Sequence, residues 1–446
     1  MPTTDARHPG LIATVGILLV AGLAGLEATI AFETYAVTTS LPSVVDALAA
    51  PAWYSAAFAA TLITSVTGMV LAGPWCDRVG ARPPLLTAIA LFVTGVLMCA
   101  LAGHIGVFVL GRLVQGVGVG MAAVTVYAIA SATVPQEHHP ALFGVVNAAW
   151  VVPSLAGPVV SGLLTEHLGW RWVYGSVAVV AVLSAAGLLV GLRGRDTRPA
   201  GDGDVRIPWG WAVAASAAVL AMSLSGGTRS AWSLLALALS TTAVVAVLTR
   251  LLPPGTLRAQ QGVPRLVAMR SLLAACAYTT ETYVPLFLQR DRGVPIVLSG
   301  LALAGSAVGW AVGAWWQARP RRPGPPSLLP AALLVLCGPV STGLVVATGW
   351  AWWPVSVGVA LAGVGMGVAY PQISSQALAL SPRREHGRVG SSLQLGEACA
   401  VAATLALGGA AQVHLGDGLA WTYAGLAGIG VLAVLVARSA RDRPAA

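Results

Sequence analysis

Apolar segments about as long as a lipid bilayer is thick follow one another along the whole chain, and this feature constrains the fold more than any other. A helix needs roughly 20 apolar residues to cross about 30 Å of hydrocarbon. We therefore expect an all-α membrane protein that crosses the bilayer fourteen times. The segments are 14–41, 53–75, 84–103, 106–133, 141–165, 172–192, 209–226, 231–252, 266–289, 296–317, 327–348, 352–380, 387–412 and 419–438.

The composition is that of a chain whose surface faces lipid. Hydrophobic residues make up 57% of it and charged residues 9%, whereas a soluble domain carries about 25% charged residues. The formal net charge of +9 would suggest nucleic acid in a soluble protein, but in a membrane protein the position of the charges matters more, and we expect no nucleic-acid partner. The five cysteines have no metal-ligand spacing, so neither a metal site nor a disulfide framework is expected.

The basic residues are all arginine, and most lie in alternate loops that share one side of the membrane. Twenty of the 25 lie on that side and four on the other, so the positive-inside rule places both termini in the cytoplasm. A hairpin at 209–252 that does not cross would leave twelve spans with the same orientation. The larger set is Arg7, Arg78, Arg82, Arg193, Arg195, Arg198, Arg206, Arg250, Arg258, Arg265, Arg270, Arg319, Arg321, Arg322, Arg383, Arg384, Arg388, Arg438, Arg441 and Arg443, and the smaller is Arg171, Arg229, Arg290 and Arg292.

The sequence contains an internal repeat. The stretch "GVGVGMAAVTVYAIASATVPQEHHPALFG" from Gly116 matches "GVGMGVAYPQISSQALALSPRREHGRVG" from Gly363, at an offset of 247 residues. Parallel repeats about an axis along the membrane normal build two-bundle transporters. We expect a six-helix bundle at 1–192, its copy at 259–446, and an insertion at 193–258 that carries the two extra helices.

Two glutamates occupy equivalent positions in the repeats. Glu33 and Glu281, 248 residues apart, each begin the tripeptide Glu-Thr-Tyr within an apolar segment. A carboxylate at mid-membrane costs a few kcal/mol and takes up a proton unless something pairs with it. We expect the two to face each other across a central cavity and to bind the coupling protons. The alternative is a pair of neutral glutamic acids that hydrogen-bond between helices.

The loop after the second segment, "GPWCDRVGARPPLL", resembles the signature Gly-x-x-x-Asp-Arg-x-Gly-Arg-Arg/Lys of the major facilitator superfamily. Ala81 departs from it, where a basic residue is usual. The matching residues are Gly73, Asp77, Arg78, Gly80 and Arg82.

Three further stretches resemble motifs of the same superfamily. "GRLVQGVGVG" in the fourth segment is similar to its Arg-x-x-Gln-Gly motif, and "PSLAGPVVSG" in the fifth to its antiporter signature, with Pro153 and Ser161 where glycines are expected. "FETYAVTTSLP" resembles the first-helix motif of the 14-helix drug:H⁺ antiporters, with Glu33 in place of the aspartate. The matching residues of the first two are Arg112, Gln115, Gly116, Gly157, Pro158 and Gly162.

The resemblance implies roles for these motifs. Arg112, a cation inside the fourth segment, and Asp77 would take part in proton coupling. Asp77 and Arg78 would also latch one conformation through charge pairs or a helix N-terminus across the bundle interface, although Arg78 and Arg82 could equally serve only orientation. Gly157-Pro158 would kink the fifth helix and act in bundle closure.

Other polar and aromatic residues at span depth are candidates to line the substrate path. Glu397 aligns with Trp150 in the repeat, and Glu27 lies six residues before Glu33, on a different face of the helix. An apolar cavity with a few hydrogen-bonding groups suits amphipathic ligands, and bonding between helices is the alternative role. The remaining candidates are Asn147, Trp150, Gln289, Tyr370, Gln372, Ser374 and Gln394.

Together these features predict a proton-driven 14-helix exporter of lipophilic, cationic or zwitterionic compounds in a bacterial cell membrane. We expect a monomer that uses the proton-motive force and no cofactor. A dedicated exporter of one metabolite, antibiotic or lipid would share every motif. A non-transporting membrane sensor would need an appended soluble domain, and no Walker lysine, His-Glu-x-x-His or serine nucleophile motif supports an enzyme.

Overall fold

The computed structural model describes residues 15–50, 53–197, 209–225, 230–294, 296–317, 328–415 and 417–438. Over these residues the chain is helical, and they contain no β-strand. Nine of the arginines used to orient the chain, Arg7, Arg198, Arg206, Arg229, Arg319, Arg321, Arg322, Arg441 and Arg443, lie outside the described residues.

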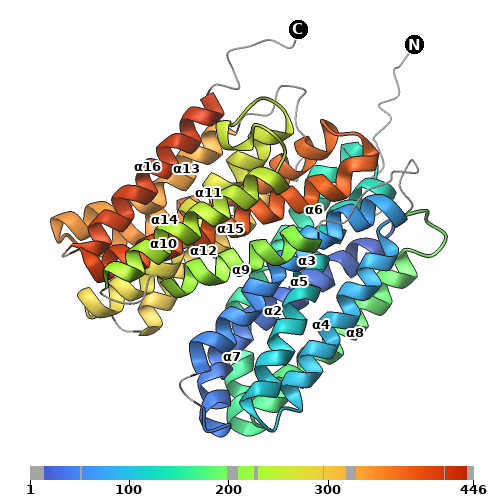
Figure 1. Cartoon of the computed structure of the whole chain (residues 1–446), viewed down its shortest axis with the longest axis horizontal. Helices are drawn as coiled ribbons and strands as arrows, with labels where there is room; N and C mark the ends of the chain where they lie inside the picture. The colour runs from blue at the N-terminus through green and yellow to red at the C-terminus, as the bar shows by residue number, and fades with distance from the viewer. Residues whose placement is uncertain are drawn as a thin grey trace, which may run out of the picture.

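The first half of the chain forms one helical bundle (Figure 1). Its helices are α2 (Ile17–Ala47), α3 (Tyr54–Val79), α4 (Arg82–Ala100), α5 (Ile105–Thr133), α6 (His139–Ala148), α7 (Val151–His167) and α8 (Trp170–Gly191).

The second half forms another bundle, preceded by two additional helices. These two are α9 (Trp209–Ser225) and α10 (Ala231–Leu251). The bundle itself consists of α11 (Val263–Leu286), continued by a π-helical turn at Phe287–Asp291, and of α12 (Ile296–Gln317), α13 (Leu329–Thr348), α14 (Trp353–Ala379), α15 (His386–His414) and α16 (Gly418–Arg438).

Each of the fourteen apolar segments coincides with helix in the structure. Among the described residues, nine helices are long and apolar enough to cross a membrane by length and composition.

The fifth segment is divided, and the division does not fall where Gly157-Pro158 predicts it. The chain turns at Ala149 and Trp150, between α6 and α7, and is helical through Gly157 and Pro158. Pro153 explains the position, because a proline has no N–H to donate to the carbonyl four residues earlier and its ring clashes with it. The equivalent residue in the repeat is Ala400, and α15 runs unbroken over 29 residues.

Equivalent glycines allow close helix contacts in both bundles. A Cβ added to Gly120 of α5 would lie 1.9 Å from the carbonyl oxygen of Ser65 in α3, and one added to Gly367 of α14 would lie 2.1 Å from that of Trp310 in α12. Small residues let membrane helices approach to backbone contact. The two bundles therefore repeat not only their sequence but also their packing.

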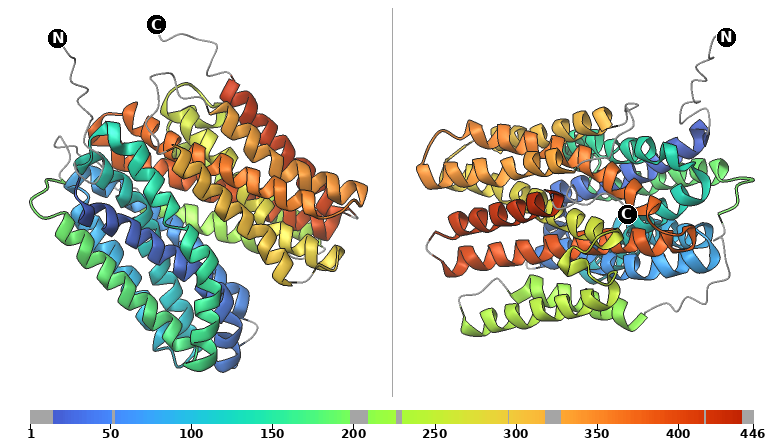
Figure 2. Two further views of the ribbon diagram at one scale, coloured as in Figure 1. Left: turned by 180° about the vertical axis from the view of Figure 1, so that it is seen from behind. Right: turned by 90° about the horizontal axis from the view of Figure 1, so that it is seen from above.

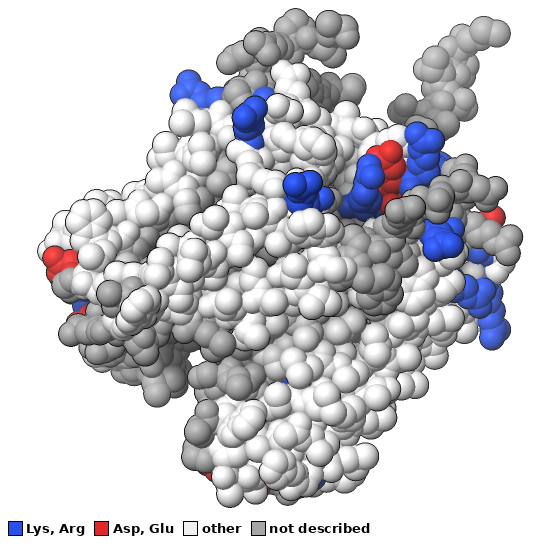
Figure 3. All heavy atoms as spheres, viewed as in Figure 1, with Lys and Arg blue, Asp and Glu red and all other residues white. Residues whose placement is uncertain are grey.

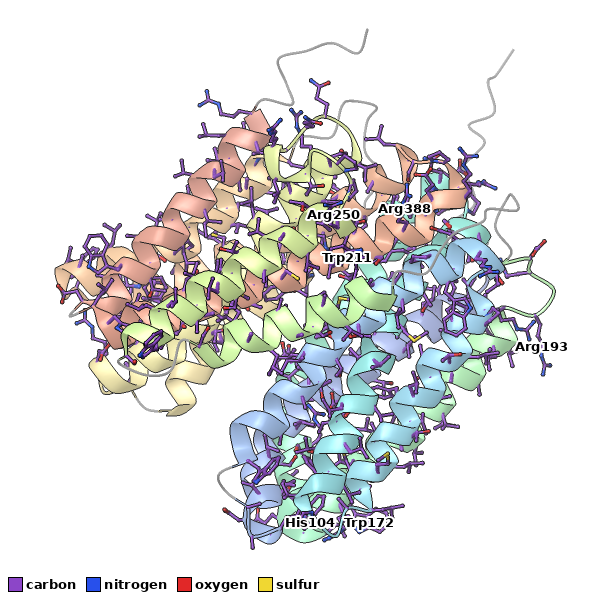
Figure 4. All side chains as sticks on the ribbon, viewed as in Figure 1. His104, Trp172, Arg193, Trp211, Arg250 and Arg388 are labelled. Atoms are coloured by element: carbon purple, nitrogen blue, oxygen red, sulfur yellow. The ribbon has the colours of Figure 1, made fainter. Side chains whose placement is uncertain are left out.

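The two ends of the molecule differ in charge. Arginine side chains gather at one end, which we call the arginine-rich end (Figure 3). Arg193, Arg250 and Arg388 lie toward it, whereas His104 and Trp172 mark the opposite end (Figure 4). On the face shown in Figure 3, the described surface between the ends carries few charged side chains, as a lipid-facing belt requires.

The two bundles meet toward the arginine-rich end and diverge toward the other (Figure 2). Helix α15 of the second bundle packs against α3 and α5 of the first, and α6 packs against α12 and α14. Helix α9 lies across this junction (Figure 1) and contacts both α3 and α15. The hydroxyl of its Ser216 donates to the carbonyl of Ile63 at 2.9 Å.

Candidate functional site

The cation inside α5 pairs with one of the two repeated glutamates. Arg112 forms an ion pair with Glu33 of α2, and their side chains are 5% and 2% exposed. Arg112 Nη1 also donates to Gln115 Oε1 at 2.9 Å, and Nε to the carbonyl of Ala57 at 3.4 Å. A buried charge is tolerated when it is paired and hydrogen-bonded, so Glu33 and Arg112 neutralise each other within the first bundle.

Glu281 has a different environment from Glu33. It accepts a hydrogen bond from the hydroxyl of Ser306 in α12, and no ion pair to it occurs among the described residues. The residue equivalent to Arg112 in the second repeat is Val359. The contacts of each glutamate lie within its own bundle, and no described hydrogen bond joins the two carboxyls. Glu33 and Glu281 are therefore equivalent in the sequence repeat but differ in the side chains that surround them.

Arg270 lies inside a helix, not in the loop where the arginine pattern places it. Helix α11 already begins at Val263, so Arg270 is two turns within it and 4% exposed. Its flanking residues, Val-Ala-Met before and Leu-Leu-Ala-Ala after the next serine, give the signal that distinguishes it from loop arginines. Arg270 is therefore a second buried cation within the membrane helices, in addition to Arg112.

Arg270 is the centre of a polar cluster. Its Nε donates to Glu397 Oε2 at 2.6 Å and its Nη2 to Gln394 Oε1 at 3.0 Å, both on α15. Its Nη1 donates to Tyr127 Oη at 2.6 Å and to Ser374 Oγ at 3.1 Å. Its guanidinium carbon also lies 4.2 Å from the ring centroid of Tyr370. We call these six residues, Arg270, Glu397, Gln394, Ser374, Tyr370 and Tyr127, the Arg270 cluster.

Glu27, in the first bundle, also has a hydrogen-bond partner within the membrane helices. The indole nitrogen of Trp150, at the junction of α6 and α7, donates to Glu27 Oε2 of α2 at 2.9 Å. Trp150 and Glu397 are equivalent in the repeat. In each bundle a carboxylate therefore takes part in a polar contact between the first and fifth spans, and this carboxylate lies on the first span in one bundle and on the fifth in the other.

The remaining substrate-path candidates divide into three groups. Tyr370, Gln394 and Ser374 belong to the Arg270 cluster. Gln372 is 3% exposed, and its amide donates to Gln317 Oε1 at 2.7 Å, so it joins α14 to α12 within the bundle. The side chains of Asn147 and Gln289 lie outside those that the structure describes.

Asp77 lies at the N-terminus of α15 in the opposite bundle. Its Oδ1 accepts from the backbone N–H of Gly387 at 2.7 Å and its Oδ2 from that of Arg388 at 2.8 Å. A carboxylate at this position satisfies free N–H groups and complements the helix dipole. The side chains of Arg78 and Arg82 are exposed.

The glycines of the motifs differ in how tightly they are packed. A Cβ on Gly73 would lie 2.7 Å from Ser391 Cβ across the bundle interface, and one on Gly116 would lie 2.4 Å from the carbonyl oxygen of Thr61. Gly80 has a φ of +88°, which favours glycine. A Cβ on Gly157 would meet Tyr35 Cβ at 3.2 Å, and one on Gly162 would meet nothing within 4 Å. The side chain of Pro158 lies outside those described.

Comparison with known proteins identifies relatives among efflux transporters. A Mycobacterium tuberculosis protein named as a probable multidrug-efflux transporter is 29% identical over 377 residues, which are 80% of this chain and 79% of that protein. Escherichia coli MdtD, whose name describes multidrug resistance, is 32% identical over 159 residues, 35% of this chain and 34% of its own length.

Solved structures with the same fold are also transporters. The human organic anion transporter MFSD10 has a TM-score of 0.69 at 17% identity, covering 94% of this chain and 98% of its own. A bacterial homologue of the iron transporter ferroportin has a TM-score of 0.66 at 13% identity, covering 96% and 99%. At these identities the likeness shows the fold.

The family model described as Major Facilitator Superfamily matches residues 18–391. The chain therefore belongs to this superfamily. It is a multi-pass membrane transporter rather than an enzyme, and the resemblance that the sequence motifs indicate is confirmed.

Proposed function

We propose that this protein is a proton-coupled antiporter that exports lipophilic cationic or zwitterionic compounds from a bacterial cytoplasm by alternating access. The positive-inside rule places its arginine-rich end in the cytoplasm. The relatives named for multidrug efflux support the export direction and the breadth of substrate. In this orientation the described bundles meet on the cytoplasmic side and diverge toward the outside (Figure 2).

The balance of charges in the membrane helices carries the proposal. Four carboxyl groups, on Glu27, Glu33, Glu281 and Glu397, lie within spans that hold two guanidinium groups, on Arg112 and Arg270. An ionised carboxylate without a partner is expensive at this depth, so each surplus acid binds either a proton or an external cation. A carboxylate that either a proton or a substrate cation can neutralise provides the chemical basis for exchanging the proton for the cation.

The contacts suggest which carboxyl has which role. Among the residues that the structure describes, Glu281 is paired only with a hydroxyl. A hydroxyl can donate to a carboxylate or accept from a carboxylic acid. We therefore assign Glu281 as the main proton site, with Glu33 held by Arg112 as its coupled partner. Glu27 and Glu397, next to the aromatic rings of Trp150 and Tyr370, would bind the substrate cation by charge and by cation–π contact.

Transport in proteoliposomes tests this proposal. The purified protein is reconstituted with an imposed pH gradient, and movement of a fluorescent lipophilic cation is followed with and without the gradient. We expect gradient-dependent movement by the wild type and loss of that dependence in Glu281→Gln. Glu166→Gln, which removes an exposed glutamate at the arginine-poor end of α7, is the matched control and should transport as the wild type does.

Two results would contradict the proposal. A wild type that moves no lipophilic cation would point to a dedicated substrate instead. A Glu281→Gln variant that keeps gradient-dependent transport would show that this carboxyl does not carry the coupling proton.

A further inference from the structure

The Arg270 cluster joins the two bundles through a single residue of the first bundle. Five of its members lie on α11, α14 and α15, and only Tyr127 comes from α5. Tyr127 accepts from Arg270 Nη1 at 2.6 Å, and its hydroxyl lies 3.2 Å from Ser374 Oγ. Its ring is also close to α15, since a Cβ on Gly390 would meet Tyr127 Cβ at 2.8 Å. When the two bundles separate at the arginine-rich end, the contacts of Tyr127 with Arg270, Ser374 and α15 must break.

The geometry of the guanidinium couples Tyr127 to Glu397. A guanidinium is planar, and its donors have fixed relative directions. When Nε is held by Glu397 at 2.6 Å, the direction of Nη1 toward Tyr127 is fixed as well. The face of the group rests on the Tyr370 ring, 4.2 Å from its centroid. The charge on Glu397 therefore influences a bond that crosses the bundle interface.

Glu397 is the accessible member of the buried pair. Its side chain is 16% exposed, whereas that of Arg270 is 5% exposed. The acid can therefore exchange a proton or meet a ligand while the guanidinium stays enclosed. The charged and titratable groups that act electrostatically with Glu397 across the neighbouring helices are Arg270, Glu27, Tyr127, Tyr278 and Tyr370.

We propose that Arg270 is a positioning residue that fastens the two bundles at the arginine-rich end while Glu397 is ionised, and that neutralising Glu397 releases it from Tyr127. The inference rests on the proposed alternating-access antiport and adds its control element. A proton taken up from the outside neutralises Glu397 and favours opening toward the cytoplasm. When a substrate cation then enters from the cytoplasm and pairs with Glu27, Glu397 releases its proton to the cytoplasm, its carboxylate pairs with Arg270 again, and the bundles fasten.

Cys76 provides a reporter of this opening. It is 3% exposed, and its Cβ lies 2.9 Å from a Cβ built on Gly387 of α15, across the interface. It lines a cavity of about 210 Å³ together with Asp77, His386 and Gly387. Separation of α3 from α15 would expose the thiol. A protein that keeps Cys76 and has Cys99, Cys276, Cys337 and Cys399 replaced by alanine would report this step alone.

The test measures the rate at which a maleimide alkylates Cys76 in the substrate-free protein, reconstituted in nanodiscs, with all variants compared at one fixed pH because the thiolate is the reacting form. In the Cys76-only parent we expect slow labelling. Tyr127→Phe should label about fivefold faster than the parent, because it removes one hydrogen bond and keeps the ring. Glu397→Gln should label as fast as Tyr127→Phe, because its uncharged amide no longer holds Arg270 as a carboxylate does.

Three further variants separate this effect from general loosening. Tyr423→Phe removes a buried hydroxyl of α16, and Glu166→Gln removes an exposed carboxylate; both should label like the parent. Arg270→Lys keeps the charge but not the planar group, and should label like Tyr127→Phe. Labelling of unfolded protein sets the upper limit of the rate.

Parent-like labelling of both Tyr127→Phe and Glu397→Gln would overturn the proposal. So would parent-like labelling of Glu397→Gln alone, because it would show that the charge on Glu397 does not hold Arg270 against Tyr127. The measurement needs neither substrate nor a gradient, so failure of the transport proposal and failure of this one are distinguishable.

Discussion

Tyr127 and Ser374 are equivalent residues of the two repeats, 247 positions apart, and their hydroxyl oxygens lie 3.2 Å from each other. Equivalent residues can meet in this way only close to the axis that relates the repeats. The axis therefore passes through the polar cluster that holds the bundles together. The residues next to this axis are therefore the most sensitive to the relative position of the two bundles.

Asp77→Asn should weaken the contact between the bundles. The carboxylate accepts two backbone hydrogen bonds from the start of α15, and hydrogen bonds to a charged group contribute about 1.5–3 kcal/mol. We expect alkylation of Cys76, measured relative to the same variant unfolded so that the effect of the neighbouring charge on the thiol is compensated, to rise about tenfold or more, since about 1.4 kcal/mol corresponds to a factor of ten. Asp417→Asn, an exposed aspartate before α16, serves as control. Unchanged labelling of Asp77→Asn would show that this cap does not hold the interface.

Gly73→Ala should hinder closure of the arginine-rich end by steric overlap. Its new Cβ would lie 2.7 Å from Ser391 Cβ and 2.9 Å from the carbonyl oxygen of Gly387, distances that require α15 to move away. Transport in proteoliposomes should fall severalfold. Gly162→Ala, whose Cβ meets nothing within 4 Å, should transport at the wild-type rate. Equal activity of the two variants would contradict the packing argument.

Glu33→Leu and Arg112→Leu should each destabilise the protein more than the double variant does. Removing one partner of a buried ion pair leaves an uncompensated charge and costs about 3–5 kcal/mol, whereas replacing both with apolar residues is often near neutral. Thermal unfolding followed by size-exclusion chromatography in detergent measures this. A double variant whose melting temperature falls by the sum of the two single effects would show that the residues act independently.

Much of the fold can be predicted from the sequence, because membrane helices are specified by length and apolarity. The predicted segment 106–133 agrees with α5, Ile105–Thr133, and the predicted segment 209–226 with α9, Trp209–Ser225. The division of the fifth span was missed, since Gly157-Pro158 matched a known motif and Pro153 did not. In the structure α7 is helical through Pro158, and the chain turns at Ala149 and Trp150, just before Pro153.

The site is less predictable than the fold. The sequence singled out Glu33, Glu281 and Arg112, but it contains no information on which glutamate the arginine meets. The repeat indicated that Glu33 and Glu281 are equivalent, yet only the first bundle supplies a cation, because Val359 occupies the position of Arg112. The arginine pattern groups Arg270 with the loop arginines because the predicted segment 266–289 places it close to a helix start, whereas α11 begins at Val263 and encloses it.

Proton counterflow driven by substrate tests the central claim most directly. Proteoliposomes are prepared with a gradient of a lipophilic cation, no pH gradient and a pH-sensitive dye inside. The account predicts that wild-type protein moves protons opposite to the cation, that Glu281→Gln moves severalfold fewer protons per cation, and that Glu166→Gln behaves as the wild type. Cation movement by the wild type without any proton counterflow would contradict the account.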